Sequence, residues 1–521
     1  MEREPSRRSF IAAIGATAAA GTLPPTGAVA REDPAGLAYR SAGALVKALA
    51  DRQISARELL DASIARIEAL DPKINAVVVR DFDRARAAAD AADAALARGE
   101  RRHLLGLPMT VKEGFGVAGL PTTRGNPKFK GWIAEIDALA VQRLKAAGAV
   151  ILGKTNVPLN LADWQSFNEV YGTTNNPWDL SRTPGGSSGG SAAALAAGFV
   201  ALELGSDVGG SLRAPAHFCG VFSHKPTLDL VPRRGPGPPL THTQAIPVRG
   251  DLSVYGPMAR SAADLALELE VVAGPDELTD GVGYKLALPA PRHDKLADFR
   301  VLVIDEHPLC PTAGSIRTAL GNLADRLQKL GATVLRQSPK LPDLAVTTRN
   351  YVDLLMPNYG VDLSPEMRDS IALRIQALRP GDDQSLKAHR LRGLILSHPD
   401  WIRASRVRVG LRARWLALFT DVDVVLCPPM PVVAFPHDHA PRRLDRMIDV
   451  DSTKIPNDDL LAWAGIATLN GLPATVAPIG RTEGGLPIGV QIIGSFLEDR
   501  TTIAFAGMIE REFGFTPPPG L

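Results

Sequence analysis

The sequence has few cysteines, little net charge and, after its first thirty residues, no long apolar run. Three cysteines, at positions 219, 310 and 427, are scattered over 521 residues, so neither a disulfide framework nor a paired-cysteine metal site is predicted. The formal net charge of +2 gives no basic excess for nucleic acid or an anionic membrane surface. No segment after residue 30 is apolar over a length that could span a bilayer. We therefore expect a packed globular protein with no nucleic-acid partner.

The first thirty residues form a separate segment. Arg7 and Arg8 precede an alanine-rich apolar stretch from Ile11 to Leu23, and Ala28-Val29-Ala30 supplies the small residues of a signal peptidase site. This pattern resembles a bacterial twin-arginine export signal, which a receptor reads and which is not a membrane anchor. We expect residues 1–30 to be removed, the mature chain to be periplasmic or secreted, and no stable membrane association afterwards. A flexible basic leader or a short anchor helix is the alternative.

Hydrophobic periodicity in residues 31–521 predicts an α/β fold. Apolar residues at helical spacing predict three surface helices, the second of which stops at Asp71-Pro72. Further along, short apolar runs alternate with helical stretches, which predicts a sheet with helices packed against it. The expected helices are 41–53, 55–70, 82–98, 137–147, 192–199 and 313–330, and the expected strands are 107–111, 149–153, 200–205, 301–304, 333–335, 423–426 and 487–494.

Two stretches depart from this alternation. Residues 226–260 contain seven prolines and predict a long irregular excursion, most clearly over 228–250, of the kind that often rims an active site. Residues 364–420 are mostly helical in pattern and rich in arginine, and we expect them to form a cap-like region over a pocket. Neither stretch contains a recognisable motif, so the substrate cannot be inferred from them.

Two glycine-flanked serine clusters and one lysine carry the chemistry. Ser187 lies in Gly185–Ser191, Ser211 ends the run Asp207-Val208-Gly209-Gly210-Ser211, and Lys112 ends a short apolar run that begins at Gly106. A serine hydroxyl is a weak nucleophile until a base removes its proton, and a lysine is such a base once burial lowers its pKa well below about 10.4. Ser187 would then bridge Ser211 and Lys112. This set predicts a serine hydrolase.

The motifs resemble those of the amidase signature family of serine hydrolases, which use a Ser, cis-Ser, Lys triad. The resemblance covers Gly106–Glu113, Gly153–Asn156, Tyr171–Trp178, both serine clusters and Lys225-Pro226-Thr227, and it resumes at Gly256–Arg260, Leu472-Pro473 and Gly485–Gly494. Nearly the whole mature chain is included. The family implies one α/β domain over residues 31–521, with a central mixed β-sheet flanked by helices on both faces. Glu113 departs from the more common aspartate after the lysine.

The resemblance assigns a role to each matching position. Ser211 would be the acyl nucleophile, Ser187 the bridging cis serine, Lys112 the general base and Ser188 a supporting hydrogen-bonding group. The remaining assignments are the oxyanion hole at Val208, Gly209, Gly210 and Ser211, and an acyl pocket faced by Leu161 and Trp164. Neither a metal nor another cofactor is implied.

The implied activity is hydrolysis of a small-molecule carboxylic amide through an acyl-serine intermediate, as in a general amidase. The alternatives within the family are an aryl-acylamidase and a hydrolase of oligoamides, lactams, carbamates or esters. A non-catalytic role and a role as one subunit of an amidotransferase that acts on charged tRNA are more remote, because an exported protein cannot meet tRNA. The apolar residues near the motifs favour a neutral, hydrophobic acyl group. The oligomeric state is left open, with a homodimer as one option.

Competing interpretations of single residues are weaker. No phosphate-loop lysine follows the glycines of 185–191, and His437-Asp438-His439 has no third metal ligand at a recognisable spacing. A Ser211 paired with His217 or His224 would lack the usual nucleophile elbow. Cys219 has an apolar setting and is expected to be an inert buried thiol, while Asp207 and Arg213 are expected to form a structural charge pair.

Overall fold

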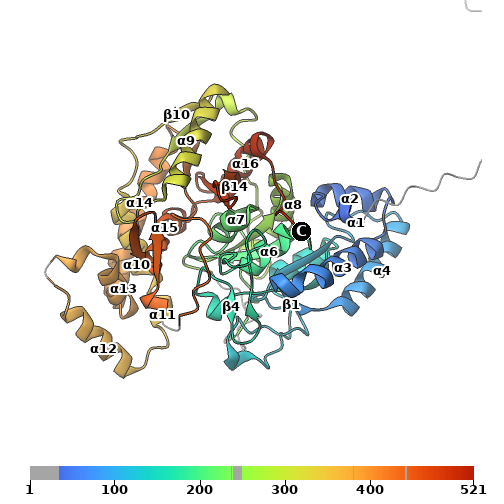
Figure 1. Cartoon of the computed structure of the whole chain (residues 1–521), viewed down its shortest axis with the longest axis horizontal. Coiled ribbons are helices and arrows are strands. Elements are labelled where there is room, and N and C mark those ends of the chain that lie inside the picture. The colour runs from blue at the N-terminus through green and yellow to red at the C-terminus, as the bar shows by residue number, and fades with distance from the viewer. Residues whose placement is uncertain (1–33, 236, 239–248, 380, 441–442, 521) are drawn as a thin grey trace, which may run out of the picture.

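In the computed structural model, one eleven-stranded mixed sheet runs through the molecule (Figure 1). The structure describes residues 34–235, 237–238, 249–379, 381–440 and 443–520, so the predicted export signal lies outside the described residues. The strand order is β1-β3-β2-β6-β8-β7-β14-β15-β11-β9-β10. These strands are β1 (Val77–Arg80), β2 (Pro108–Lys112), β3 (Val150–Thr155), β6 (Leu202–Asp207), β7 (Phe222–Lys225), β8 (Val254–Ala259), β9 (Arg300–Val303), β10 (Thr333–Leu335), β11 (Val424–Cys427), β14 (Ala474–Arg481) and β15 (Pro487–Ile493).

Parallel pairs lie on either side of an antiparallel middle, and the edge strand β1 is antiparallel to β3. β2 is parallel to both β3 and β6, and β9 is parallel to both β10 and β11. The pairs from β6 through β8, β7, β14 and β15 to β11 are antiparallel. Two short hairpins lie outside the sheet: β4 (Phe167–Asn168) with β5 (Gly172–Thr173), and β12 (Met447–Val450) with β13 (Thr453–Pro456).

Helices flank the sheet on both faces, so the predicted fold class is confirmed. The helices are α1 (Pro34–Leu37), α2 (Ala42–Ala50), α3 (Ala56–Ile74), α4 (Phe82–Ala97), α5 (Leu139–Ala146), α6 (Gly189–Ala196), α7 (Arg213–Cys219), α8 (Ala262–Val272), α9 (Gly314–Lys329), α10 (Leu344–Leu355), α11 (Pro357–Gly360), α12 (Pro365–Gln376), α13 (Leu386–Leu394), α14 (His398–Leu418), α15 (Leu461–Asn470) and α16 (Asp499–Phe513). In the view of Figure 1, α10–α14 lie at the opposite side of the molecule from α1–α4. Among the described residues, no helix combines the length and the apolar character needed to cross a bilayer.

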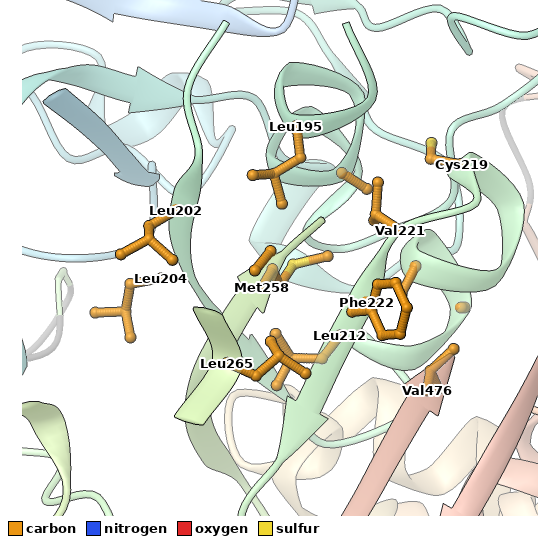
Figure 2. Close-up of a cluster of buried hydrophobic side chains, with 14 of the residues drawn as sticks. Leu195, Leu202, Leu204, Leu212, Cys219, Val221, Phe222, Met258, Leu265 and Val476 are labelled. Carbon is orange, nitrogen blue, oxygen red and sulfur yellow. The ribbon is translucent and has the colours of Figure 1, made fainter. Parts of the chain in front are cut away.

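The core that supports the central strands is built from aliphatic and aromatic side chains of both layers. Figure 2 shows Leu195 of α6, Leu202 of β6, Phe222 of β7, Met258 of β8 and Leu265 of α8 in one cluster, all fully buried. Burial of each such side chain contributes roughly 1.5–3 kcal/mol. The cluster fixes the strand ends on which the serine loops sit.

Most predicted elements are found close to their expected positions, and two predictions are wrong in detail. The second helix does not stop at Asp71-Pro72 but runs to Ile74, with Pro72 inside its last turn and Asn75 in the left-handed region at φ 58°. Pro72 removes one helical hydrogen bond, the one that its N–H would donate to the Glu68 carbonyl, and the helix continues for only two residues beyond it. The excursion 226–260 contains the fully buried strand β8. This strand was not predicted because Pro257 lies within it and proline is rare in central strands.

Candidate active site

Lys112 is the last residue of β2, in a strand with neighbours on both sides, and it is fully buried. Its Nζ donates to Ser187 Oγ at 2.8 Å and to Ser206 Oγ at 2.8 Å, with Ser206 O at 3.4 Å. Within the described residues, no carboxylate oxygen lies within the 4.0 Å of an ion pair with this nitrogen. A buried amine held only by neutral oxygens is poised to lose its proton.

The electrostatic surroundings favour the neutral amine. Burial lowers the pKa of Lys112 to about 7; the Asp207 carboxylate opposes this shift, and the Arg124 guanidinium adds to it. Glu203 of β6, the register partner of Thr110, is also fully buried, and burial raises the pKa of its carboxyl to about 7. An acid that stays protonated up to neutral pH does little to hold Lys112 in its charged form.

The loop that carries Ser187 and Ser188 lies directly against the loop of Ser211. The Gly186–Ser187 peptide is cis, and Gly185 has a φ of 90° that places it against Pro215. The Ser188 amide donates to the Ser211 carbonyl at 3.2 Å. The Ser188 hydroxyl donates to the carbonyl of Ser206 at 3.3 Å, so it supports the residue that contacts Lys112. The predicted bridging serine and nucleophile are thus on touching backbone segments.

Ser211 follows Gly210, whose φ is 92°. The two residues before Gly210 are held by hydrogen bonds from distant side chains. Tyr351 of α10 donates its hydroxyl to the Val208 carbonyl at 2.6 Å, and Trp164 donates Nε1 to the Gly209 carbonyl at 2.9 Å. Ser211 itself is 7% exposed. These two anchors fix the orientation of the peptide planes that precede the nucleophile.

The four predicted oxyanion amides do not have equal surroundings. The Gly210 amide donates to Asp207 Oδ1 at 2.9 Å, so this N–H is already used. The amides of Val208, Gly209 and Ser211 have no hydrogen-bond acceptor among the described residues. The geometry therefore leaves three of the four predicted donors available to a substrate oxygen. Their role remains a prediction.

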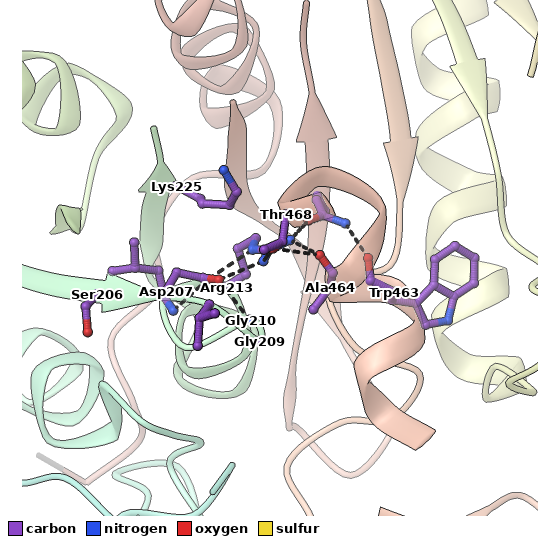
Figure 3. Close-up of polar contacts among 12 residues, drawn as sticks. Ser206, Asp207, Gly209, Gly210, Arg213, Lys225, Trp463, Ala464 and Thr468 are labelled. Carbon is purple, nitrogen blue, oxygen red and sulfur yellow. Dashed lines mark hydrogen bonds and ion pairs between the residues drawn. The ribbon is translucent and has the colours of Figure 1, made fainter. Parts of the chain in front are cut away.

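Asp207 and Arg213 form a fully buried ion pair that holds the nucleophile loop (Figure 3). Arg213 donates Nη2 to Asp207 Oδ1 at 2.7 Å and Nε to Oδ2 at 3.0 Å, and its other donors reach Ala464 O, Gln491 Oε1 and Thr468 Oγ1. Burial alone would raise the pKa of Asp207, but Arg213 outweighs it and the pKa is lowered to about 2. The expected structural pairing is confirmed.

A small pocket opens beside the nucleophile. Leu161 and Trp164 line it together with Ser211, as the acyl-pocket prediction requires, and Leu161 packs against Gly114 two residues after Lys112. The other lining residues are Ala162, Asp163, Val208, Gly209, Leu355, Met356, Tyr359, Arg443, Asp458 and Leu461. Apolar side chains dominate the lining, and the charged groups include an Arg443–Asp458 pair at 3.6 Å. A wider groove between α8 and α16 contains none of the predicted catalytic residues.

Sequence reasoning missed Ser206 and Tyr351. Ser206 is the penultimate residue of β6, five positions before Ser211, and a hydroxyl at a strand end next to the lysine strand was the available signal. Tyr351 belongs to α10, whose sequence contains no motif, so only the tertiary structure reveals its bond to the nucleophile loop.

The competing nucleophiles and ligands are engaged elsewhere. His217 accepts from the Gly489 amide, and burial lowers its pKa to about 4, while His224 contacts Thr475 and Asp499. Burial raises the pKa of the Cys219 thiol well above its usual value, which agrees with an inert thiol. Among the described residues, no group of three or more side chains could hold a metal ion, so His437, Asp438 and His439 do not form such a group.

The chain matches a known family over most of its length. The family model described as Amidase matches residues 58–503. A glutamyl-tRNA(Gln) amidotransferase subunit of Anaeromyxobacter sp. (strain K) is 36% identical over 520 residues, covering 93% of this chain and 97% of that protein. A protein of Mycobacterium tuberculosis (strain ATCC 25618 / H37Rv) that bears the amidase name AmiB2 is 36% identical, covering 92% of this chain and 97% of that protein.

Solved structures show the same fold. One, described as a vestigial protein complex that reveals the evolutionary origins of an s-triazine catabolic enzyme, is 32% identical with a TM-score of 0.76, and the match covers 92% of this chain and 100% of that chain. A bacterial aryl acylamidase of the amidase signature family gives a TM-score of 0.77 at 24% identity, covering 93% of this chain and 99% of that chain. At that identity the likeness concerns the fold.

Proposed function

Because this chain belongs to the amidase signature family and is therefore an amidase-family hydrolase, we propose that it hydrolyses the C–N bond of a small carboxylic amide through an acyl-serine intermediate. The observation that carries the proposal is the buried Lys112 amine, which contacts Ser187 and has a pKa lowered to about 7. A base of that pKa matches proton transfer near neutral pH.

In the proposed acylation, the Ser211 oxygen attacks the amide carbon while its proton passes through Ser187 to the Lys112 amine. The negative charge of the tetrahedral intermediate lies near the amides of Val208, Gly209 and Ser211, each of which would contribute about 3 kcal/mol as an oxyanion donor. The proton then returns through Ser187 to the leaving nitrogen as the C–N bond breaks. This leaves an ester on Ser211 and releases ammonia or an amine.

Deacylation repeats the proton path with water. Lys112 removes a proton from a water molecule that attacks the ester carbon, and the proton is returned to Ser211 as the C–O bond breaks. The products are the free carboxylic acid and the regenerated hydroxyl. Apart from the attacking water, these steps use the chain's own side chains and amides.

The first test is product release from a panel of amides, anilides, carbamates and esters by the chain from Arg31 onward. Ser211→Ala should lower the turnover of every active substrate by at least about a thousandfold, because the nucleophile is lost. Ser370→Ala, which removes an exposed serine of α12, is the matched control and should keep wild-type turnover. Full activity in Ser211→Ala would contradict the acyl-serine mechanism.

A role within an amidotransferase is the second candidate, and the specific observation in its favour is the 36% identity to the Anaeromyxobacter amidotransferase protein over 93% of this chain. In that case the ammonia released from the amide would be passed to another protein. The isolated chain would then show little amide hydrolysis, and copurification from its native host would recover stable partner proteins. Substantial hydrolysis by the isolated chain would favour the stand-alone amidase.

We further propose that residues 1–30 direct export, on the basis of Arg7, Arg8 and the apolar stretch that follows them. In a bacterial host with twin-arginine transport, the wild-type chain should be recovered in processed form from the periplasmic fraction. Replacing both arginines by lysine should retain the unprocessed chain in the cytoplasm. Equal distribution of the two proteins would contradict the export proposal.

A further inference from the structure

Two neighbouring arginines, Arg124 and Arg233, form no ion pair with a carboxylate among the described residues. The half-buried Arg124 donates Nη1 to the Pro238 carbonyl at 3.1 Å. Arg233 lies with its guanidinium carbon 5.7 Å from the centre of the Tyr255 ring, and its Nε is buried without a hydrogen-bond acceptor. Among the described residues, neither guanidinium has a carboxylate within 4.0 Å. The two positive charges therefore lack the partners that buried arginines usually have.

The backbone places Arg124 next to the pocket of Ser211. Its carbonyl accepts from the Asn160 amide at 2.7 Å, and the following residue, Leu161, lines the pocket beside the nucleophile. Tyr359 of the same pocket is close enough to Arg124 for the two to interact electrostatically, as is Lys112. Arg124 is thus hydrogen-bonded to the segment that lines the pocket.

Tyr255 connects Arg233 to the same place. It is the register partner of Ser206, which contacts Lys112, and its ring packs on Phe115 with centroids 4.6 Å apart. Arg124 and Tyr255 also interact electrostatically. The guanidiniums of Arg124 and Arg233, which we call the cationic rim, therefore both lie near Tyr255, the register partner of the serine that contacts Lys112.

Nearby carboxylates do not neutralise the rim. Glu113 accepts from the amides of Thr123 and Arg124 and from the Tyr171 hydroxyl, so its oxygens are already used by backbone and phenol. Asp229 is close enough to Arg233 to interact electrostatically, yet it forms no ion pair with it. Residues 239–248, which follow Pro238 in the sequence, contain no aspartate or glutamate.

We propose that the cationic rim of Arg124 and Arg233 binds a carboxylate on the substrate while the scissile amide lies at Ser211. A guanidinium presents a planar set of N–H donors that matches the two oxygens of a carboxylate, and such charge-assisted bonds are stronger than neutral ones. The inference rests on the proposed amidase function and adds a substrate class to it, a carboxylate-bearing amide. The carboxylate belongs either to the acyl half or to the amine half, and the apolar pocket favours a neutral acyl group.

The test uses two pairs of substrates that differ only by exchange of a terminal methyl for a carboxylate. Pentanamide and the monoamide of glutaric acid test the acyl half, and N-butanoyl-propylamine and N-butanoyl-β-alanine test the amine half. We expect the carboxylated member of one pair to exceed its neutral partner by about tenfold or more in kcat/KM, as one charge-assisted bond supplies. The pair that shows this preference locates the carboxylate.

The ratio within that pair should fall towards one in Arg124→Met and, to a smaller extent, in Arg233→Met, and Arg124→Lys should retain part of it. Arg374→Met, which removes an exposed guanidinium of α12, is the matched control and should leave the ratio unchanged. Rising salt concentration should reduce the preference, because the rim is partly open to solvent. A ratio near one for both pairs in the wild type, or a ratio that survives in both rim variants, would overturn the proposal.

Failure of the proposed function can be told apart from failure of the rim. If no substrate turns over and phenylmethylsulfonyl fluoride does not modify Ser211, the amidase mechanism fails. In that case the rim is tested by calorimetric titration of glutarate into Ser211→Ala. Binding that is lost on adding Arg124→Met supports the rim, and no binding, or binding unaffected by that change, overturns it.

Discussion

Arg213 and Lys112 are two buried cations, on α7 and β2, that differ in how their charges are compensated. Arg213 is fully buried with five hydrogen bonds to fixed acceptors, two of them to the Asp207 carboxylate (Figure 3). Lys112 is equally buried, but within the described part of the chain its amine hydrogen-bonds only to Ser187 and Ser206. A guanidinium with every N–H paired is part of the scaffold, whereas an amine with neutral partners can give up its proton.

The difference explains where the protein keeps its structure rigid and where it allows chemistry. The Arg213 cluster reaches from the nucleophile loop to α15 and β15 through Ala464, Thr468 and Gln491, so it fixes that loop to distant elements. The Lys112 amine instead donates hydrogen bonds to two serine hydroxyls, which are groups that can both give and accept a proton. Substitutions at the two positions should therefore produce opposite patterns of damage.

The largest effect is expected for Lys112→Met, which replaces the amine by an uncharged chain of similar length. We expect kcat/KM to fall by roughly a thousandfold or more, because general base catalysis of this kind contributes about 10²–10⁴. The free energy of unfolding should change little or increase, because no ion pair is lost and a buried amine is removed. Steady-state kinetics and urea unfolding measure the two quantities. Loss of folding together with activity would place Lys112 in the scaffold instead.

Arg213→Met should mainly lower the free energy of unfolding, which Lys112→Met should leave nearly unchanged. The change leaves Asp207 buried without its partner, which costs about 3–5 kcal/mol of unfolding free energy, and it loosens the loop that Asp207 holds through the Gly210 and Leu212 amides. Thermal and urea unfolding measure the loss, with Arg374→Met as the exposed control that should leave stability within about 0.5 kcal/mol. A variant as stable as the wild type would show that the buried pair is dispensable.

The sequence was sufficient for much of the fold and for the contact between Lys112 and Ser187. The catalytic roles of Lys112, Ser187 and Ser211 stay a prediction. The strand β10 was predicted over the residues it occupies, and β2, β3, β6 and β15 within a few residues, because short apolar runs bounded by turns are local signals. Lys112, Ser187 and Ser188 were brought together as expected, since each lies in a distinctive motif. The resemblance to the amidase signature family is confirmed by the match over residues 58–503.

What the sequence could not give depends on contacts between distant segments. Tyr351 reaches Val208 across 143 positions, and the identity of Arg124 as an uncompensated charge depends on which carboxylates are absent around it. The use of the Gly210 amide by Asp207 is also a matter of loop geometry. No periodicity or motif encodes these relations, because they arise when the elements pack.

The smallest effect concerns pH and the Ser206 hydroxyl. With Lys112 acting as a neutral base of pKa about 7, kcat/KM should rise about tenfold per pH unit below that value, because the protonated amine cannot accept a proton, and should level off above it. Ser206→Ala removes an oxygen that accepts from the ammonium at 2.8 Å, so the charged form loses support, the pKa of Lys112 falls and the rising limb moves to lower pH. The plateau should drop by about tenfold or less, as expected when a positioning bond is lost. The pH profiles of kcat/KM for both proteins test this prediction. A rising limb above pH 10 in the wild type would contradict a neutral Lys112. A limb at the same pH in the variant would show that Ser206 does not influence the pKa of Lys112.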